Sequence, residues 1–417
     1  MTSRTSLVAG LFASCFLGSA LASPAQDLFD QATFLIGFYY NGPAQVKNFR
    51  ELRKTYQPQL DQLCAADKEK CGFDAARRVI GNIVQSISAN DPFTQIMSAN
   101  QLADEQRYGA GLGPAAPRIG VWTRQTPQGL VVVESFPGEP AFEAGVRRGD
   151  VITTINNAPA TPQVLGVAEN SKVAFSLSVS RQGTPRALNL TARVADATMQ
   201  PRVEINSGIA YIRVYHFYTS EEYSTADRIY EAVRKATQGG AKGIVLDLRD
   251  SLTGYDSEAL LAAGAFIPRG GFIYDRRFQG ADETHTLENG QLFNQPEGQE
   301  KNPESQAPAP FLTNLPTVVL VNRYTLNSAE MLAYFLQSAR RAKVVGEPTA
   351  GALGISGNAE GPLINGEFVA VSSLKMKNLD GSPFPMRVTP DVNVPEDLSA
   401  LSSGHDPALE KALELLK

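Results

Sequence analysis

The segment RYTLNSAEMLAYFLQSARRAKVVGEPTAGALG covers residues 323–354 and decides how the second half of the chain folds. It follows TVVLVN (residues 317–322), an apolar run with the length of a buried strand. After a short polar turn, SAEMLAYFLQSARRA carries apolar residues at helical spacing, and KVVGEPT begins with another short apolar run. Strand, turn, helix and strand in this order predict a parallel β-α-β crossover.

The same alternation extends over residues 198–417. Strands are expected in GIAYIRVYHF and AKGIVLDLRD, and helices in SEEYSTADRIYEAVRKATQ and DSEALLAAGAFI. The segment 279–310, rich in Gln, Glu, Asn and Pro, is expected to be a solvated excursion. This half of the chain is therefore predicted to form an α/β core.

Length and composition set the broad class of the protein. With 417 residues the chain exceeds one ordinary domain, so two or three domains are expected. Its 43% hydrophobic and 8% aromatic residues are typical of a globular protein. The net charge of −5 argues against nucleic-acid binding. The three histidines lie far apart in the sequence, so no metal site and no cofactor are expected.

The first residues have the composition of a signal peptide. Arg4 is followed by the apolar run 7–17 and by Ala-Leu-Ala at 20–22, a small-residue cleavage site. The run is too short to span a bilayer. An amphipathic first helix and a lipid on Cys15 are the alternatives. Residues 1–22 are therefore predicted to direct export to the periplasm or the cell exterior, and no transmembrane segment is expected.

A helical part is predicted after this segment, over residues 23–114. DLFDQATFLIGFYY and FDAARRVIGNIVQSI carry apolar residues at helical spacing, and the Gly/Pro/Ala-rich GAGLGPAAP marks a boundary. Cys64 and Cys71 lie in QLCAADKEKCGF. In an exported chain, two such cysteines predict a local disulfide that closes a short loop between helices.

Residues 115–197 change to short β segments around PGEPAFEAGVRRGDVITTIN. This run resembles a PDZ domain in the circularly permuted bacterial form. In such domains a peptide adds as a strand to a sheet edge, and backbone N–H groups hold its terminal carboxylate. The matching loop is APRIGVWT, which implies peptide binding at Arg118, Ile119, Gly120 and Val121. Arg118 replaces a glycine of many relatives; it either narrows the loop, adds a positive charge or is a solvated surface arginine.

The whole chain resembles the C-terminal processing peptidases, also called tail-specific proteases. NDPFTQIMS, IAYIRVYHF, GAKGIVLDLRD, RAKVVGEPTAG and VTPDVNV are similar to landmarks of that family. The resemblance implies an α+β multidomain fold with a helical N-terminal segment (23–114), a PDZ domain (115–197) and a ClpP/crotonase-like α/β peptidase core (198–417). It also implies a serine endopeptidase that recognises C-terminal tails of proteins and uses a serine nucleophile with a lysine base.

The residues at the implied catalytic positions depart from the family. The family nucleophile stands three residues before a glutamate, and counting back from Glu330 gives Asn327. The lysine of Thr-Phe-Gly-Lys-Gly corresponds to Ala352 in TAGAL. The resemblance places the oxyanion hole at Gly254, the one glycine that remains of Asn-Pro-Gly-Gly, and at Ala329. The sequence therefore predicts a degenerate dyad.

Ser328 is the nearest hydroxyl that could replace the missing nucleophile. Alternatively, Asn327 and Glu330 only cap the helix in a capping-box arrangement. His216, at the end of YIRVYH, is either a base for Ser328 or a satisfied histidine at the edge of the core.

Other titratable side chains receive no functional role. Lys375 and Lys377 alternate on a late strand and are expected to be solvated surface residues. His285 and His405 lie in polar contexts expected to be loops.

Two functions remain open from the sequence. The first is an exported tail-specific serine peptidase with a degenerate dyad. The second is a non-catalytic pseudopeptidase that binds protein or peptide tails as partners through its PDZ domain.

Overall fold

The computed structural model describes residues 23–44, 48–87, 91–110, 112–194, 199–252, 254–276 and 280–417. The predicted signal peptide over 1–22, including Cys15, lies outside these residues. The chain divides into two compact units, Met1–Ala99 with Gly357–Ser373 and Asn100–Ser356 with Leu374–Lys417. Within the described ranges, no helix has both the length and the apolar character needed to cross a membrane.

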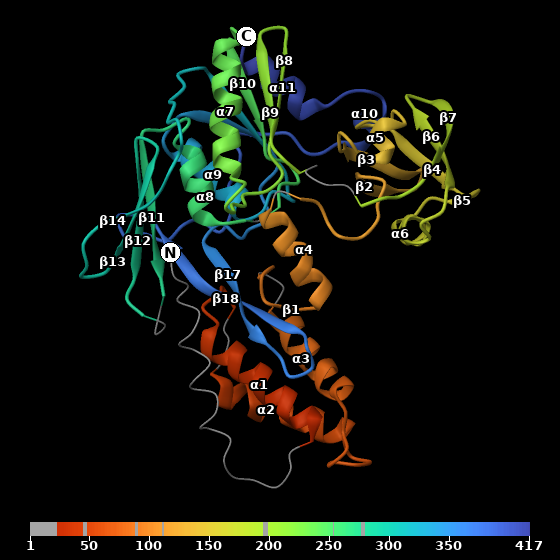
Figure 1. Ribbon diagram of the computed structural model, residues 1–417, viewed down its shortest axis with the longest axis vertical. Helices are drawn as coiled ribbons and strands as arrows, with labels where there is room; N and C mark the ends of the chain where they lie inside the picture. The colour runs from red at the N-terminus through yellow and green to blue at the C-terminus, as the bar shows by residue number, and fades with distance from the viewer. Residues whose placement is uncertain are drawn as a thin grey trace. The chain divides into compact units, whose positions relative to one another are not determined.

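The first unit packs three helices against short strands. Its elements are α1 (Pro24–Tyr39), α2 (Phe49–Leu63), α3 (Phe73–Ile87), β1 (Gln95–Met97), most of β17 (Ile355–Pro362) and the first part of β18 (Phe368–Lys377) (Figure 1). β1 pairs antiparallel with β18, with Gln95 opposite Ala370. Apolar side chains of the helices form one core with Val369 and Val371 of β18. The helices thus bury their apolar stripes against one another and against this strand.

A disulfide joins Cys64 to Cys71, which confirms the sequence prediction. Cys64 is the C-cap of α2, and Cys71 lies just before the start of α3. The bond therefore closes the connection between these two helices.

Replacing both cysteines by serine (Cys64→Ser with Cys71→Ser) is expected to lower the free energy of unfolding by about 2–3 kcal/mol, because the reduced chain regains the entropy of a short loop. Urea unfolding of oxidised wild type and of the double variant measures the difference. Equal stability would show that the disulfide does not constrain the unfolded chain.

The second unit contains a six-stranded antiparallel sheet in residues 121–190. The chain reaches it through α4 (Ala99–Gly109). Its strands run in the order β2-β3-β4-β6-β7, with β5 paired to β4. The elements are β2 (Val121–Thr126), β3 (Gly129–Ser135), α5 (Pro140–Glu143), β4 (Val151–Ile155), β5 (Ala158–Pro159), α6 (Pro162–Asn170), β6 (Phe175–Arg181) and β7 (Thr184–Leu190). β2 stands at one end of the order, so one of its edges is unpaired within this sheet.

The largest core of the second unit surrounds a mostly parallel sheet. Its strands run in the order β19-β16-β15-β10-β9-β8, and only β8 pairs antiparallel. They are β8 (Arg202–Asn206), β9 (Ile209–Arg213), β10 (Gly243–Asp247), β15 (Thr317–Val321), β16 (Ala342–Gly346) and β19 (Val392–Asn393). Every residue of β10 and β15 is buried, as expected for strands covered on both faces. The predicted α/β core is confirmed.

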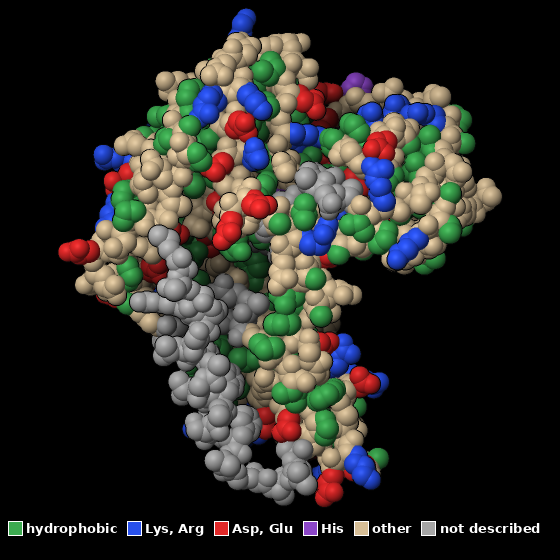
Figure 2. All heavy atoms as spheres, in the orientation of Figure 1, with side chains coloured by type: hydrophobic (Ala, Val, Ile, Leu, Met, Phe, Trp, Pro, Cys, Tyr) green, Lys and Arg blue, Asp and Glu red, His purple; other side chains and the backbone are tan. Residues whose placement is uncertain are grey.

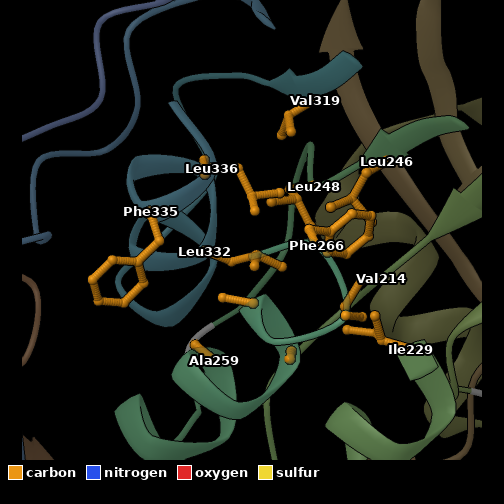
Figure 3. Packing of buried hydrophobic residues seen from close by; sticks show 14 of the residues in the cluster. Val214, Ile229, Leu246, Leu248, Ala259, Phe266, Val319, Leu332, Phe335 and Leu336 are labelled. Carbon is orange, nitrogen blue, oxygen red and sulfur yellow. The ribbon is translucent and has the colours of Figure 1, made fainter. Parts of the chain in front are cut away.

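Helices cover both faces of this parallel sheet. They are α7 (Thr225–Gln238), α8 (Asp256–Ala263) and α9 (Ser328–Ser338) on one face and α11 (Pro407–Leu415) on the other. The short helix α10 (Leu398–Ser402) instead packs through Leu401 against Val131 and Val133 of β3. Alternate strand residues point to opposite faces, so Leu246 and Val319 pack with α7, α8 and α9 while Val245 and Val318 pack with α11. Figure 3 shows the first of these layers, where strand side chains meet those of the helices, among them Ile229, Leu332 and Leu336.

The expectation of a solvated excursion over 279–310 is wrong. The region forms antiparallel strands with β11 (Arg269–Asp275), namely β12 (Glu283–Glu288), β13 (Gln291–Pro296) and β14 (Asn302–Gln306). Leu287 and Leu292 are buried, whereas most neighbouring residues are polar. An antiparallel sheet needs only one apolar face. A few apolar residues are therefore enough to form the buried face of this sheet, and the polar composition of the segment did not indicate strands.

The surface carries charges of both signs. Figure 2 shows Lys and Arg interspersed with Asp and Glu on the face in view, without a large area of one sign. This agrees with the small net charge of −5.

Candidate functional site

The turn between β15 and α9 is held by buried polar side chains. The Asn322 N–H donates to Thr325 Oγ1 at 3.0 Å, and the Thr325 hydroxyl donates to the Leu248 carbonyl at 2.9 Å. Asn327 then adopts φ 47° and ψ −103°. Positive φ is uncommon for a residue other than glycine, and such a conformation persists only where the surroundings impose it. The turn is therefore sharp, strained and fixed in place.

The Asn327 side chain fills the position implied for a nucleophile. It is 2% exposed, and its amide nitrogen donates to the Ile355 carbonyl at 2.8 Å and the Ala352 carbonyl at 3.3 Å. The structure thus brings the two implied dyad positions together. The buried Ser328 hydroxyl donates to Asn327 Oδ1 at 3.2 Å. An amide and a methyl group stand where the family pattern has a hydroxyl and an amine.

Glu330, in the first turn of α9, binds the backbone on both sides of the site. Its carboxylate accepts the N–H groups of Asn327 at 2.8 Å and of Gly351 and Ala352 at 2.9 Å, together with the Thr349 hydroxyl. Burial raises the pKa of Glu330, and these hydrogen bonds oppose the rise. Glu330 therefore fastens the loop 349–352 to the start of α9.

The residues implied for the oxyanion hole lie close to the turn. The Leu326 N–H donates to the Ser251 carbonyl at 3.2 Å, which joins the segment around Gly254 to the turn. Gly254 forms a parallel bridge with Phe217, and an added Cβ would lie 2.1 Å from the Phe217 carbonyl oxygen, so only glycine fits. The Ala329 N–H donates to the Leu326 carbonyl at 3.2 Å and is therefore not free for an oxyanion.

His216 is buried in an aromatic cluster rather than at the turn. Its ring contacts Tyr108, Tyr218 and Tyr223, and Nδ1 lies 3.5 Å from Thr225 Oγ1. Burial lowers its pKa to about 3, so the imidazole is neutral and only weakly basic. None of the contacts in the described part of the chain joins His216 to the turn.

The remaining lysines and histidines have structural surroundings. Lys375 is exposed, and Lys377 pairs with Asp275 at 2.9 Å. His405 is exposed, as expected. The loop predicted around His285 is wrong, because His285 is only 6% exposed and lies on β12.

His285 is also held by polar and aromatic partners. Its Nδ1 lies 2.8 Å from Glu304, and its ring stacks on Phe272. The loop expected around it is therefore part of a sheet.

The loop implied for peptide binding also has internal partners. The Ile119 N–H donates to Glu169 Oε1 at 2.8 Å, and Gly120 has φ 77° with no room for a side chain beside Glu139. The Arg118 guanidinium pairs with Glu139 at 2.5 Å and is 16% exposed, so it is not a solvated surface arginine. Val121 opens the edge strand β2.

The sequence did not single out two buried acids in the first turn of α8. Asp256 is 4% exposed and accepts the Tyr274 hydroxyl at 2.7 Å; burial raises its pKa to about 6. Glu258 accepts the Ser224 hydroxyl at 2.6 Å and the Ala226 N–H at 2.7 Å, and burial raises its pKa to about 7. Acids are common in the first turn of any helix, so their position alone carried no functional signal.

Asp256 lies close to the turn through a short chain of contacts. The Ser356 hydroxyl interacts with the Asp256 carboxyl, and Ser356 follows Ile355, whose carbonyl accepts the Asn327 amide. A carboxyl with a pKa near 6 exchanges its proton close to neutral pH. Asp256 is thus the titratable group that these contacts connect to the turn.

Glu258 predicts a pH dependence of stability. Its pKa in the folded protein, about 7, lies above the ordinary 4.5, so the stabilising proton is fully present below pH 4.5 and is lost as the pH rises through 7. Glu258→Gln keeps a hydrogen-bond acceptor without the charge. At pH 8 it is expected to raise the free energy of unfolding by up to about 3 kcal/mol, and at pH 5 by little.

Urea unfolding at the two pH values measures this difference. Glu231→Gln, on the exposed side of α7, is the matched control and should change little. Equal stabilisation by Glu258→Gln at pH 5 and pH 8 would contradict the assignment.

The part of the chain that contains this site is similar to known proteins. Residues 208–394 match the model described as peptidase family S41. The chloroplastic C-terminal processing peptidase of Tetradesmus obliquus is 24% identical over 75% of this chain and 64% of its own length. The carboxyl-terminal-processing protease of Synechocystis is 26% identical over 78% of this chain and 74% of its own. The chain spans less than two thirds of the algal relative.

A solved structure of a photosystem II D1 C-terminal processing protease has a similar fold. It superposes with a TM-score of 0.53 at 21% identity and covers 94% of this chain and 97% of its own. This likeness supports the mixed α/β fold. Both implied dyad positions, Asn327 and Ala352, fall within the residues that match the family model.

Proposed function

We propose, from the match of residues 208–394 to peptidase family S41, that the chain is an exported serine-type endopeptidase that recognises protein C-terminal tails but cleaves weakly. Recognition is assigned to the segment 115–197 as a PDZ domain, and weak cleavage to a degenerate dyad in the core. The predicted signal peptide over 1–22 is the basis for export. Relatives named as C-terminal processing peptidases support the substrate class.

One observation carries the proposed weak cleavage. Asn327 occupies the strained turn, and its amide nitrogen donates to the Ala352 carbonyl at 3.3 Å. An amide is neither a useful nucleophile nor a base, and an alanine cannot take a proton. Ser328 supplies a hydroxyl, but that hydroxyl donates to an amide oxygen, which is also a very weak base. Catalysis without the catalytic residues reaches only about 10³–10⁴-fold over water.

The edge strand β2 supports the proposed tail recognition. Gly120 adopts φ 77° immediately before it, which turns the backbone of 119–121. A peptide that pairs with β2 would bring its terminal carboxylate to the N–H groups of these residues. The core of this segment contains Ile119 together with strand residues such as Leu130 and Ile152, so the loop is anchored.

Restoring the dyad tests the frame of the site. Asn327→Ser with Ala352→Lys is expected to raise cleavage of an unfolded protein with an apolar tail by about a hundredfold or more, because general-base catalysis contributes 10²–10⁴-fold. The single change Asn327→Ser is the matched control, since it supplies a hydroxyl without a base. Thermal unfolding of each variant shows whether the buried lysine is tolerated.

Cleavage by the unmodified protein and by Ser328→Ala tests the proposed degenerate dyad from the other side. The weak cleavage by the unmodified protein should fall further in Ser328→Ala. Robust cleavage that survives Ser328→Ala would refute the proposed degenerate dyad. If the unmodified protein binds tails but shows no cleavage at all, the non-catalytic alternative is favoured.

Tail recognition is tested by two glycines with positive φ in the same segment. At Gly120 a Cβ would lie 2.1 Å from the Glu139 side chain, whereas at Gly138 it would meet nothing within 4 Å. Gly120→Ala should therefore reduce binding of a free-carboxylate peptide at least about tenfold, and Gly138→Ala should not. Fluorescence anisotropy with the full chain measures both. Unchanged binding in Gly120→Ala would remove the loop from the proposal.

A further inference from the structure

In the loop 118–121, which is proposed to bind the terminal carboxylate of a tail, one backbone N–H group already donates a hydrogen bond to Glu169. Glu169 lies in the last turn of α6, and its Oε1 accepts the Ile119 N–H at 2.8 Å. A terminal carboxylate of a bound tail would need the same kind of donor at the same residues. A carboxylate of the protein itself thus stands where the ligand's carboxylate is expected.

The charges around this contact disfavour a second carboxylate. Two acids, Glu139 and Glu169, interact with the Arg118 guanidinium, and Glu139 also interacts with Arg193. Glu139 is fully buried and paired with Arg118. A tail that arrived with Glu169 still in place would bring its own carboxylate against that of Glu169 at the same N–H donor. Like charges brought together in this way disfavour binding.

The position of Glu169 in its helix is itself unfavourable. An acidic side chain in the last turn of a helix faces the negative end of the helix dipole. Burial raises the pKa of Glu169, the Ile119 N–H and Arg118 oppose this rise, and Glu139 adds to it. The bond to Ile119 therefore offsets part of a cost, and a side chain on a helix surface can turn into solvent when a competitor replaces it.

We propose that Glu169 is an internal competitor for the terminal carboxylate of the tail: it closes the loop 118–121 in the peptide-free protein and must leave before a tail binds. This inference rests on the proposed tail recognition and adds a specificity-determining residue to it. The competition weakens binding of every tail with a free carboxylate and leaves an amidated peptide unaffected.

Competition by a carboxylate makes binding depend on pH. Glu169 loses its charge as the pH falls through its raised pKa, and its hold on the Ile119 N–H then weakens. The groups that face it are the Arg118 guanidinium and Glu139, which the same guanidinium pairs. Tail affinity should therefore increase from pH 8 to pH 5.5 in the unmodified protein.

The experiment uses the full chain and an amino-terminally labelled octapeptide that ends in Leu-Ala-Ala, with a free or an amidated terminus. Glu169→Ala is expected to tighten binding of the free-carboxylate peptide about tenfold at pH 8, leave the amidated peptide unchanged and flatten the pH dependence. Glu143→Gln, an exposed acid of the same segment, is the matched control and should behave like the unmodified protein.

The outcomes separate this inference from the proposed function. If Glu169→Ala binds the free-carboxylate peptide no more tightly while Gly120→Ala still weakens it, Glu169 is not a competitor and tail recognition stands. If neither the unmodified protein nor any variant binds the free-carboxylate peptide more tightly than the amidated one at either pH, both tail recognition and competition by Glu169 are refuted. Amide hydrogen exchange gives a peptide-independent readout, since the Ile119 N–H should exchange faster in Glu169→Ala; equal exchange would overturn the closed loop.

Discussion

The buried carboxylate of Glu330 is the contact on which the candidate site depends. It accepts three backbone N–H groups, from Asn327, Gly351 and Ala352, and so joins the start of α9 to the loop that follows β16. Each of these donors would lose a partner in a dry interior if the carboxylate were removed, at about 1–3 kcal/mol apiece. The frame is thus fixed by a carboxylate that binds the backbone on both sides of the site. The turn thus keeps its geometry with Asn327 and Ala352 at the two positions implied for the dyad.

Charged pairs fix the antiparallel sheet of residues 121–190 to the parallel core within the second unit. Glu134 of β3 pairs with Arg213 at 2.9 Å, and both side chains are buried. Arg124 of β2 binds Asp250, whose N–H donates to the Asn322 side chain beside the turn. The attraction within a buried ion pair does little more than offset the free-energy cost of desolvating its two charges. The main effect of these pairs is therefore on geometry. The proposed peptide edge and the turn are therefore positioned by one connected set of polar contacts.

The sequence predicted those parts of the molecule whose physics is local. Runs such as those of β10 and β15 are apolar throughout because both of their faces are buried, and this identified the parallel core. The strands at 283–306 and the burial of His285 were missed because an antiparallel sheet with one solvated face hides its few apolar residues among polar ones. Glu169 and Asp256 were missed because their partners, Ile119 and Tyr274, are distant in sequence.

Asparagine at position 327 suits both the backbone conformation and the hydrogen bonds of this turn. Positive φ is several-fold more acceptable to Asn than to most other residues, so the strained turn tolerates it. Its amide also satisfies two buried carbonyls, those of Ala352 and Ile355, and accepts the Ser328 hydroxyl. A serine at this position could not make all three bonds with a single hydroxyl. Asn327 therefore stabilises a closed turn, and the bonds that hold its amide in place also engage the Ser328 hydroxyl, the nearest hydroxyl that could attack a peptide bond.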